Sequence, residues 1–349
     1  MLKSWLARNA IFKAKYTKWA LLAIVSFISL LSLTKKYTIV LNLSTEEDHN
    51  IWTEKELLET LDAERKRIRS DLVNFTFPAE SLTRSIKELL PEEGGTQHMT
   101  IIISYWRSGS TFLGDILNSH PATVYFYEPF RRYRQQQLRS PPKSEEAYQL
   151  LAKLLNSDYS DTEAYLDFEK NSNSFKEKNI PLHRVCKHEG IKCFEPHFLS
   201  QLMKLYPFML LKTTRLRLSL IEPFLNSLRV LRYEEVAFEP QKKTKELLSF
   251  MGLELHRSVL EFLITHTKFE AGGSYDTFRN STATALAWRS SSPERLRDVQ
   301  SHCEIAIRLW GYRVISNFTD INNFSPVKPN FTVTQHFRPS AEEGLNCRL

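Results

Sequence analysis

A polar loop from Arg107 to Thr111 follows an apolar run and opens a segment with helical spacing. The run Ile101–Ile103 is β-branched and uninterrupted, as in a strand that is buried on both faces. Unpaired N–H groups at a helix N-terminus attract anions, and a glycine such as Gly109 lets the backbone approach one closely. Arg107 adds a positive fork, and neighbouring hydroxyls add donors. The pattern predicts a phosphate- or sulfate-binding loop, with an ordinary turn and capping serines as the alternative.

The loop is not a Walker A loop, because the pattern Gly-x-x-x-x-Gly-Lys-Ser/Thr is absent. This absence disfavours a nucleotide-dependent kinase or another P-loop enzyme. Residues Arg107–Gly114 instead resemble the 5′-phosphosulfate loop of Golgi carbohydrate sulfotransferases, in the branch that 6-O-sulfates N-acetylglucosamine or galactose. Further stretches fit the same family in the same order, from about residue 99 to about residue 315: His120-Pro121, Tyr127–Phe130, Leu211–Arg217, Arg232–Val236, Ala287–Arg289 and Gly311–Arg313.

The resemblance implies a donor, a base and an acceptor. The implied donor is 3′-phosphoadenosine 5′-phosphosulfate, used as a co-substrate without a metal, and the implied acceptor is a glycan. Glu128 matches the position of the family's base, which accepts the proton of the sugar hydroxyl. A glutamate that only forms an ion pair at a strand end is the alternative. Arg107 is implied as a second catalytic residue, and the donor's 5′ side is assigned to Arg107, Ser108, Gly109, Ser110, Thr111 and Phe112.

Two other groups of residues allow a functional and a structural interpretation. Lys212, Arg215 and Arg217 follow an expected strand, where they either contact the anionic donor or a sulfated acceptor, or form an exposed helix start. Trp288 either stacks against the acceptor sugar or packs in the core.

One signature of the family is not found in this chain. In this branch an apolar strand leads into Arg-Asp-Pro-Arg and a helix start with Ser-Arg, which hold the donor's 3′-phosphate. Here residues 218–228 alone join the two flanking motifs, and Arg229 or Arg232 are the candidate substitutes. Each charge-assisted hydrogen bond that is lost weakens binding by about 1.5–3 kcal/mol. Two functions therefore stay open: an active 6-O-sulfotransferase, or a catalytically impaired member that binds glycan or pairs with an active enzyme.

Alternating strands and helices predict an α/β fold, a P-loop-like three-layer sandwich with a mostly parallel central sheet. An N-terminal membrane anchor, predicted from hydropathy below, precedes this fold. Strands are expected at 99–105, 123–127, 208–212 and 230–233. Helices are expected at about 145–155, at 242–251 and along a single face from Leu296 to Trp310, preceded by a capping box at Ser291 and Glu294. Residues 53–72 predict an amphipathic helix, either a self-association seam or a solvated spacer.

Charge and hydropathy predict the membrane topology. The net charge is +7, yet residues 1–36 hold seven cations and no acid, so the remaining 40 basic and 40 acidic residues balance and a nucleic-acid partner is disfavoured. Residues 19–34 are apolar, with five cations before them and two after. This excess predicts an uncleaved signal anchor in a single-pass type II Golgi membrane protein with a lumenal body. A cleaved signal peptide is the alternative.

These signals define the expected domains and modifications. The domains are a cytosolic tail (1–18), a transmembrane signal anchor (19–34), a lumenal stem (35–95), a sulfotransferase domain (96–316) and an irregular glycosylated tail (317–349). Homo-oligomers are expected through the stem or the anchor. Of four cysteines, Cys186 and Cys193 are spaced to close a small disulfide loop, and a zinc cluster with His183 and His188 is disfavoured. Six sequons agree with a lumenal body: Asn42, Asn74, Asn280, Asn317, Asn323 and Asn330.

Overall fold

The structure is a computed structural model that describes residues 52–79, 81–187, 190–268, 277–328 and 331. The chain divides into two compact units, Met1–Leu57 and Leu58–Leu349, and the fold described below is that of the second unit. The predicted anchor at 19–34 lies outside the described residues. Among the residues that are described, no helix is both long enough and apolar enough to cross a membrane.

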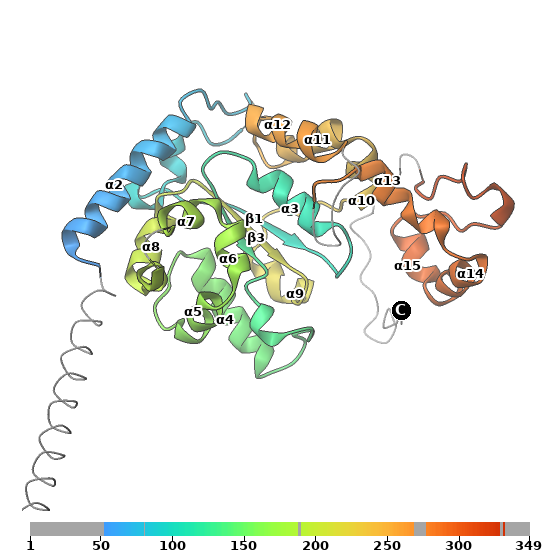
Figure 1. Ribbon diagram of the computed structural model, residues 1–349, viewed down its shortest axis with the longest axis horizontal. Helices are drawn as coiled ribbons and strands as arrows, with labels where there is room; N and C mark the ends of the chain where they lie inside the picture. Colours follow the sequence, from blue (N-terminus) through green and yellow to red (C-terminus); the bar gives the residue numbers. More distant parts are fainter. Residues whose placement is uncertain (1–51, 80, 188–189, 269–276, 329–330, 332–349) are drawn as a thin grey trace, which may run out of the picture. The chain divides into compact units, whose positions relative to one another are not determined.

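A parallel sheet forms the centre of the fold (Figure 1). Its strands are β1 (His98–Ile103), β2 (Thr123–Tyr127) and β3 (Phe208–Thr213), in the order β1-β3-β2. The register pairs Ile103 with Thr213 and Tyr127 with Lys212, so the three carboxyl ends lie at one edge. Three of the expected strands and the parallel arrangement are confirmed.

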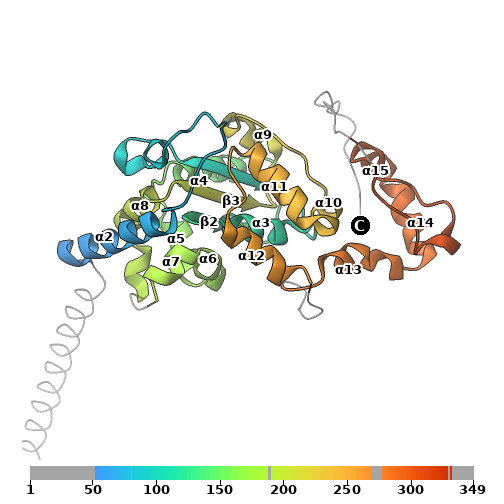
Figure 2. The same cartoon turned by 90° about the horizontal axis from the view of Figure 1, so that it is seen from above.

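Helices cover the sheet. All six residues of β3 are buried, which requires cover on both faces of the strand. Helix α3 (Ser110–Asn118) connects β1 to β2 and packs on β2 and β3, and α12 (Arg257–His266) packs on α3 and α11 (Pro240–Phe250), as Figure 2 also shows. Helices α6 (Asn173–Lys178) and α7 (Ile180–Val185) pack on β2. The other helices are α4 (Lys143–Leu155), α5 (Glu163–Lys170), α8 (Pro196–Lys204), α9 (Leu218–Ile221), α10 (Tyr233–Phe238), α13 (Ser281–Leu286), α14 (Pro293–His302) and α15 (Glu304–Leu309).

The amphipathic helix predicted at 53–72 is α2 (Glu54–Asp71), and from Leu58 onward it belongs to the second unit. Leu61 and Ile68 on one face are buried, and so is Glu64 between them. Glu64 accepts hydrogen bonds from Arg184 of α7 and from the Tyr206 hydroxyl. The apolar face of α2 therefore packs on the protein's own body, and the interpretation of residues 53–72 as a solvated spacer is wrong.

The strand expected at 230–233 is not formed. Residues 225–232 are irregular, and α10 begins at Tyr233. The Glu235 carboxylate accepts a hydrogen bond from the Arg232 N–H at 3.0 Å, which fixes the helix start there. Val230 remains 36% exposed, and no described strand lies beside it to pair with. A short apolar run without a neighbouring strand is insufficient for a strand.

The expected helical face from 296 to 310 is divided into α14 and α15 at Cys303. Cys303 is buried with φ −115° and ψ 18°, outside the helical region, and it is disulfide-bonded. The N-cap of α14 is Ser292, which accepts from the Arg295 N–H at 3.3 Å, so the expected cap at Ser291 is off by one residue. Gly311 adopts φ +68° after α15, as expected for a helix end.

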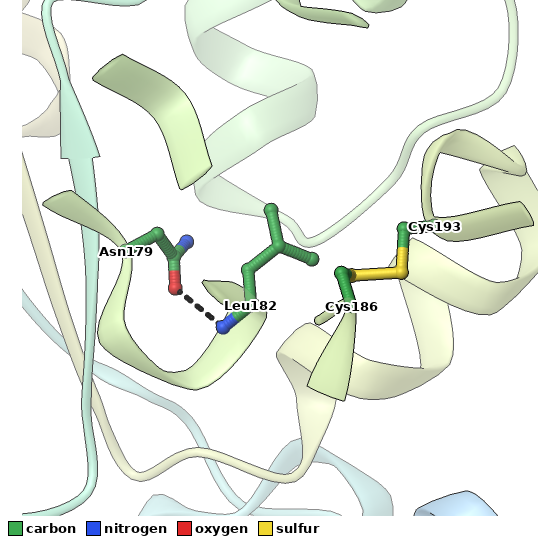
Figure 3. Close-up of a disulfide and its surroundings, with 4 residues drawn as sticks. All are labelled: Asn179, Leu182, Cys186 and Cys193. Carbon is green, nitrogen blue, oxygen red and sulfur yellow. Dashed lines mark hydrogen bonds between the residues drawn. A yellow bond between two sulfur atoms is a disulfide. The ribbon is translucent and has the colours of Figure 1, made fainter. Parts of the chain in front are cut away.

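The small disulfide loop expected between Cys186 and Cys193 is confirmed (Figure 3). It joins the end of α7 to a short 3₁₀ helix, Gly190–Phe194. The start of α7 is fixed by Asn179, whose side chain accepts from the Leu182 N–H at 3.2 Å. Because each sulfur is bonded to the other, neither thiolate is available as a metal ligand.

Glu169 of α5 supports a prediction about pH. It is 1% exposed, and burial raises its pKa to about 8, against the opposing effects of Arg131 and Ser172. Between about pH 5 and 8 the folded state holds a proton that the unfolded state has released, so stability falls as pH rises. We measure the free energy of unfolding in urea for the variant Glu169→Gln and for the wild type. We expect the difference between them to shift in favour of the variant by more than about 1 kcal/mol as the pH rises from 5 to 8. Parallel stability curves would contradict this assignment.

Candidate active site

Residues from three segments meet at the carboxyl edge of the sheet. The hydrogen bonding between strands continues past the end of β1, where the Ser104 N–H donates to the Thr213 carbonyl at 3.1 Å. It also continues past β2, where the Glu128 N–H donates to the Lys212 carbonyl at 3.0 Å. The loop after β1 and the residue after β2 therefore flank the end of β3. In open α/β sheets, ligands bind outside the carboxyl ends of the strands.

The predicted anion loop lies at this edge and has an open helix start. The N-cap of α3 is Gly109, which has no side chain to cap the first N–H groups. This arrangement differs from an ordinary turn with capping serines. Arg107 has φ +66°, an uncommon backbone for a residue with a side chain, and Glu128 has φ +54°. Such conformations concentrate at functional sites.

The predicted role of Gly109 needs a correction. A Cβ atom added there would lie 2.1 Å from Cδ2 of Tyr233, the first residue of α10. The bare side of this glycine is therefore covered by an aromatic ring rather than left open to an anion. Phe112 packs on the same ring at 6.3 Å between centroids and is buried, so its side chain supports the loop from below.

The pair Gly109 and Gly94 gives a matched test of this packing. Both have φ above +80°, but an added Cβ at Gly94 meets nothing within 4 Å. Alanine costs about 1–2 kcal/mol at either position from the backbone alone. We expect Gly109→Ala to lose about 1–3 kcal/mol more than Gly94→Ala in urea unfolding, because only the first displaces Tyr233. Equal losses would show that the ring moves aside freely.

Glu128 is 4% exposed and lies between two cations. Its Oε1 is 2.9 Å from Nζ of Lys212, and its Oε2 is 2.5 Å from Nη1 of Arg215. Oε2 also accepts from the Thr214 N–H and hydroxyl, at 3.2 and 3.0 Å. The ion pairing foreseen as one alternative is present. A carboxylate oxygen has two lone pairs, so Oε1 retains capacity to accept one further proton donor.

The three predicted basic residues have different positions. Lys212 is buried beneath the loop, with Nζ 3.5 Å from Oγ1 of Thr111 and 4.5 Å from the centre of the Tyr127 ring. Burial lowers the pKa of the Arg215 guanidinium, while the charge of Glu128 acts against this. Arg215 Nε also donates to the Arg134 carbonyl at 2.5 Å. Lys212 is therefore the cation that links Glu128 to the loop. Arg217 is exposed at the start of α9.

The other expected residues are engaged elsewhere. Arg232 is buried, where it pairs with Glu235 and donates to the Gly311 carbonyl at 3.1 Å, so it holds the fold together. Arg229 pairs with Glu246 at 3.7 Å on the surface. Trp288 packs on Phe324 at 6.3 Å between centroids, consistent with the structural interpretation.

Arg279 is a residue that the sequence reasoning missed. Burial raises the pKa of Tyr233, and the nearby positive charge of Arg279 opposes the shift, so Arg279 lies close to the ring that covers Gly109. Arg279 is half-buried, and no hydrogen bond or ion pair of its guanidinium is found among the described residues. Its only sequence signal is a position next to the sequon at Asn280, which gives no indication of an anion site.

Comparison with known proteins finds similar sequences among carbohydrate sulfotransferases. The chain is 31% identical over 101 residues to carbohydrate sulfotransferase 1 of Danio rerio, and 33% identical over 99 residues to carbohydrate sulfotransferase 3 of Homo sapiens. It is 32% identical over 111 residues to carbohydrate sulfotransferase 6 of Homo sapiens. These matches over part of the chain support membership of the carbohydrate sulfotransferase family. The resemblance inferred from the motifs is confirmed at this level.

The extent of these matches is limited. They cover 28%, 28% and 30% of this chain, and 24%, 21% and 28% of the three relatives, so the chain spans about a quarter of the length of the curated sulfotransferases it matches. No family model matches the chain, and no solved structure matches it. The similarity to sulfotransferases therefore rests on a part of the chain, and the arrangement of the site is described from the chain's own residues.

Proposed function

We propose that this chain transfers a sulfuryl group from 3′-phosphoadenosine 5′-phosphosulfate to the 6-hydroxyl of N-acetylglucosamine or galactose in glycans. The observation that carries the proposal is the buried Lys212–Glu128 pair, 2.9 Å apart, beneath an anion loop at the carboxyl edge of a parallel sheet. The family of the matched relatives supports the reaction class. A P-loop-like three-layer sandwich is the fold we propose for the sulfotransferase domain at 96–316.

The donor fits the chemistry of the loop. Arg107, the hydroxyls of Ser108, Ser110 and Thr111 and the first N–H groups of α3 are donors suited to anionic oxygens. Lys212 adds a buried positive charge from below. When bound, the donor supplies a sulfuryl group whose S–O bond to phosphate breaks as an S–O bond to the sugar oxygen forms. Arg107 and Lys212 stabilise the negative charge that moves to the phosphate side.

Glu128 is the proposed general base. Its Oε1 has the remaining capacity to accept a hydrogen bond, so the proton of the sugar hydroxyl passes to this atom. Arg215 and Thr214 hold Oε2 and thereby fix the orientation of the carboxylate. The same Lys212 contacts both the base and the loop, and so it couples proton removal to charge stabilisation.

We also propose a single-pass type II Golgi membrane location, with the anchor at 19–34, a stem at 35–95, a glycosylated tail at 317–349 and self-association through the anchor. The cation excess before the apolar stretch supports this orientation. The disulfide at Cys186 and three exposed sequon asparagines, Asn74, Asn317 and Asn323, suit a lumenal body.

A catalytically impaired family member is the second candidate. The observation that favours it is the engagement of Arg232, which removes one proposed substitute for the missing 3′-phosphate signature.

The test is transfer of a radiolabelled sulfuryl group to methyl β-N-acetylglucosaminide and methyl β-galactoside by the full chain. Transfer that is lost in Glu128→Gln supports the enzyme. Binding of the donor without any transfer supports the impaired member.

A further inference from the structure

Tyr105 and Trp106 form an aromatic pair between β1 and the anion loop. Their ring centres are 5.3 Å apart with planes at 60°. Tyr105 is 56% exposed, whereas Trp106 is partly buried. A single exposed aromatic residue is ordinary on a protein surface. An exposed ring that contacts a second ring beside a candidate active site offers an aromatic face to a ligand.

This pair is tied to the site on two sides. The Ser108 N–H of the loop donates to the Tyr105 carbonyl at 3.3 Å, which fixes the backbone of the pair to the loop. The Arg215 guanidinium lies over the Trp106 ring at 5.8 Å and is also paired with Glu128. The chain of contacts from Tyr105 through Trp106 and Arg215 ends at the proposed base.

We propose that the Tyr105 ring, supported by Trp106, is the stacking platform for the acceptor sugar. This inference rests on the proposed function, because the sugar must present its hydroxyl to Glu128. A pyranose ring has a face of C–H groups that stacks on an aromatic face while its hydroxyls stay in water. The donor's adenine also stacks on aromatic rings, so the experiment must separate sugar from nucleotide.

The experiment is saturation-transfer NMR on the full chain with methyl β-N-acetylglucosaminide, in the presence of adenosine 3′,5′-bisphosphate. We expect Tyr105→Ala to weaken sugar binding roughly 3- to 10-fold. Tyr105→Phe keeps the ring and is expected to bind like the wild type. Phe250→Ala is the matched control, because Phe250 is 41% exposed on α11, and it is expected to change nothing. Tyr105 is exposed, so neither of its variants is expected to unfold the protein.

Calorimetric titration of adenosine 3′,5′-bisphosphate completes the test. Unchanged nucleotide affinity in Tyr105→Ala, together with weakened sugar binding, supports the acceptor platform. Three results overturn it: wild-type sugar affinity in Tyr105→Ala, a loss of nucleotide affinity in that variant, or no sugar binding by the wild type. A wild type that binds sugar through Tyr105 but fails to transfer sulfate contradicts the proposed reaction and leaves the platform standing.

Discussion

Replacing Glu128 with glutamine is expected to destabilise the protein by about 3–5 kcal/mol and to lower sulfuryl transfer at least 100-fold. The stability loss follows because Lys212 and Arg215 are both buried and both take their counter-charge from this carboxylate. The transfer loss follows because an amide oxygen is too weak a base for a sugar hydroxyl. Urea unfolding measures the first effect, and the radiolabelled transfer assay measures the second.

A double variant separates the two roles of Glu128. Combining Glu128→Gln with Lys212→Met removes one of the cations left without a partner, so part of the stability is expected to return. Transfer is expected to stay low, because neither the base nor the buried charge is present. A Glu128→Gln protein as stable as the wild type would contradict the ion-pair account. Transfer by the double variant at the wild-type rate would contradict the base.

Replacing Arg279 with glutamine is expected to weaken binding of adenosine 3′,5′-bisphosphate about 10- to 100-fold. The reason is that Arg279 lies near Tyr233 at the loop, and its guanidinium has no hydrogen-bond partner among the described residues. One charge-assisted hydrogen bond to a phosphate contributes about 1.5–3 kcal/mol. Isothermal titration calorimetry on the full chain measures the change.

Two comparisons test whether Arg279 acts at the loop. Adenosine 5′-phosphosulfate keeps the 5′ group that the loop is proposed to hold, so its affinity is also expected to fall in Arg279→Gln. Arg229→Gln is the control, since Arg229 pairs with Glu246 on the surface. Unchanged affinity for both nucleotides in Arg279→Gln, or a loss in the Arg229 variant instead, would refute the assignment.

The parts of the fold that local sequence determines were predictable. The three formed strands are continuous apolar runs, and α4 carries helical spacing, so period and length were sufficient. The Cys186–Cys193 disulfide followed from the short separation of the two cysteines. The expected strand at 230–233 failed because a strand depends on a neighbour, which a one-dimensional pattern does not contain.

The candidate site was predictable in its residue types but not in its contacts. The residue types from Arg107 to Thr111 after a strand indicated the loop, and the resemblance to the sulfotransferase family indicated Glu128. The packing of Tyr233 on Gly109 joins residues 124 positions apart, and no sequence signal announces it. The ion pairs of Lys212 and Arg215 with Glu128 likewise depend on the strand order β1-β3-β2. This order places β3 between the other two strands.

Binding of adenosine 3′,5′-bisphosphate to the full chain, by calorimetry, tests most directly whether this edge of the sheet is the donor site. The account predicts saturable one-to-one binding that Lys212→Met weakens at least 10-fold, because Lys212 lies between the loop and Glu128. The matched control Lys242→Met removes an exposed lysine from α11 and is expected to bind like the wild type. No binding by the wild type, or equal binding by Lys212→Met, would contradict the account.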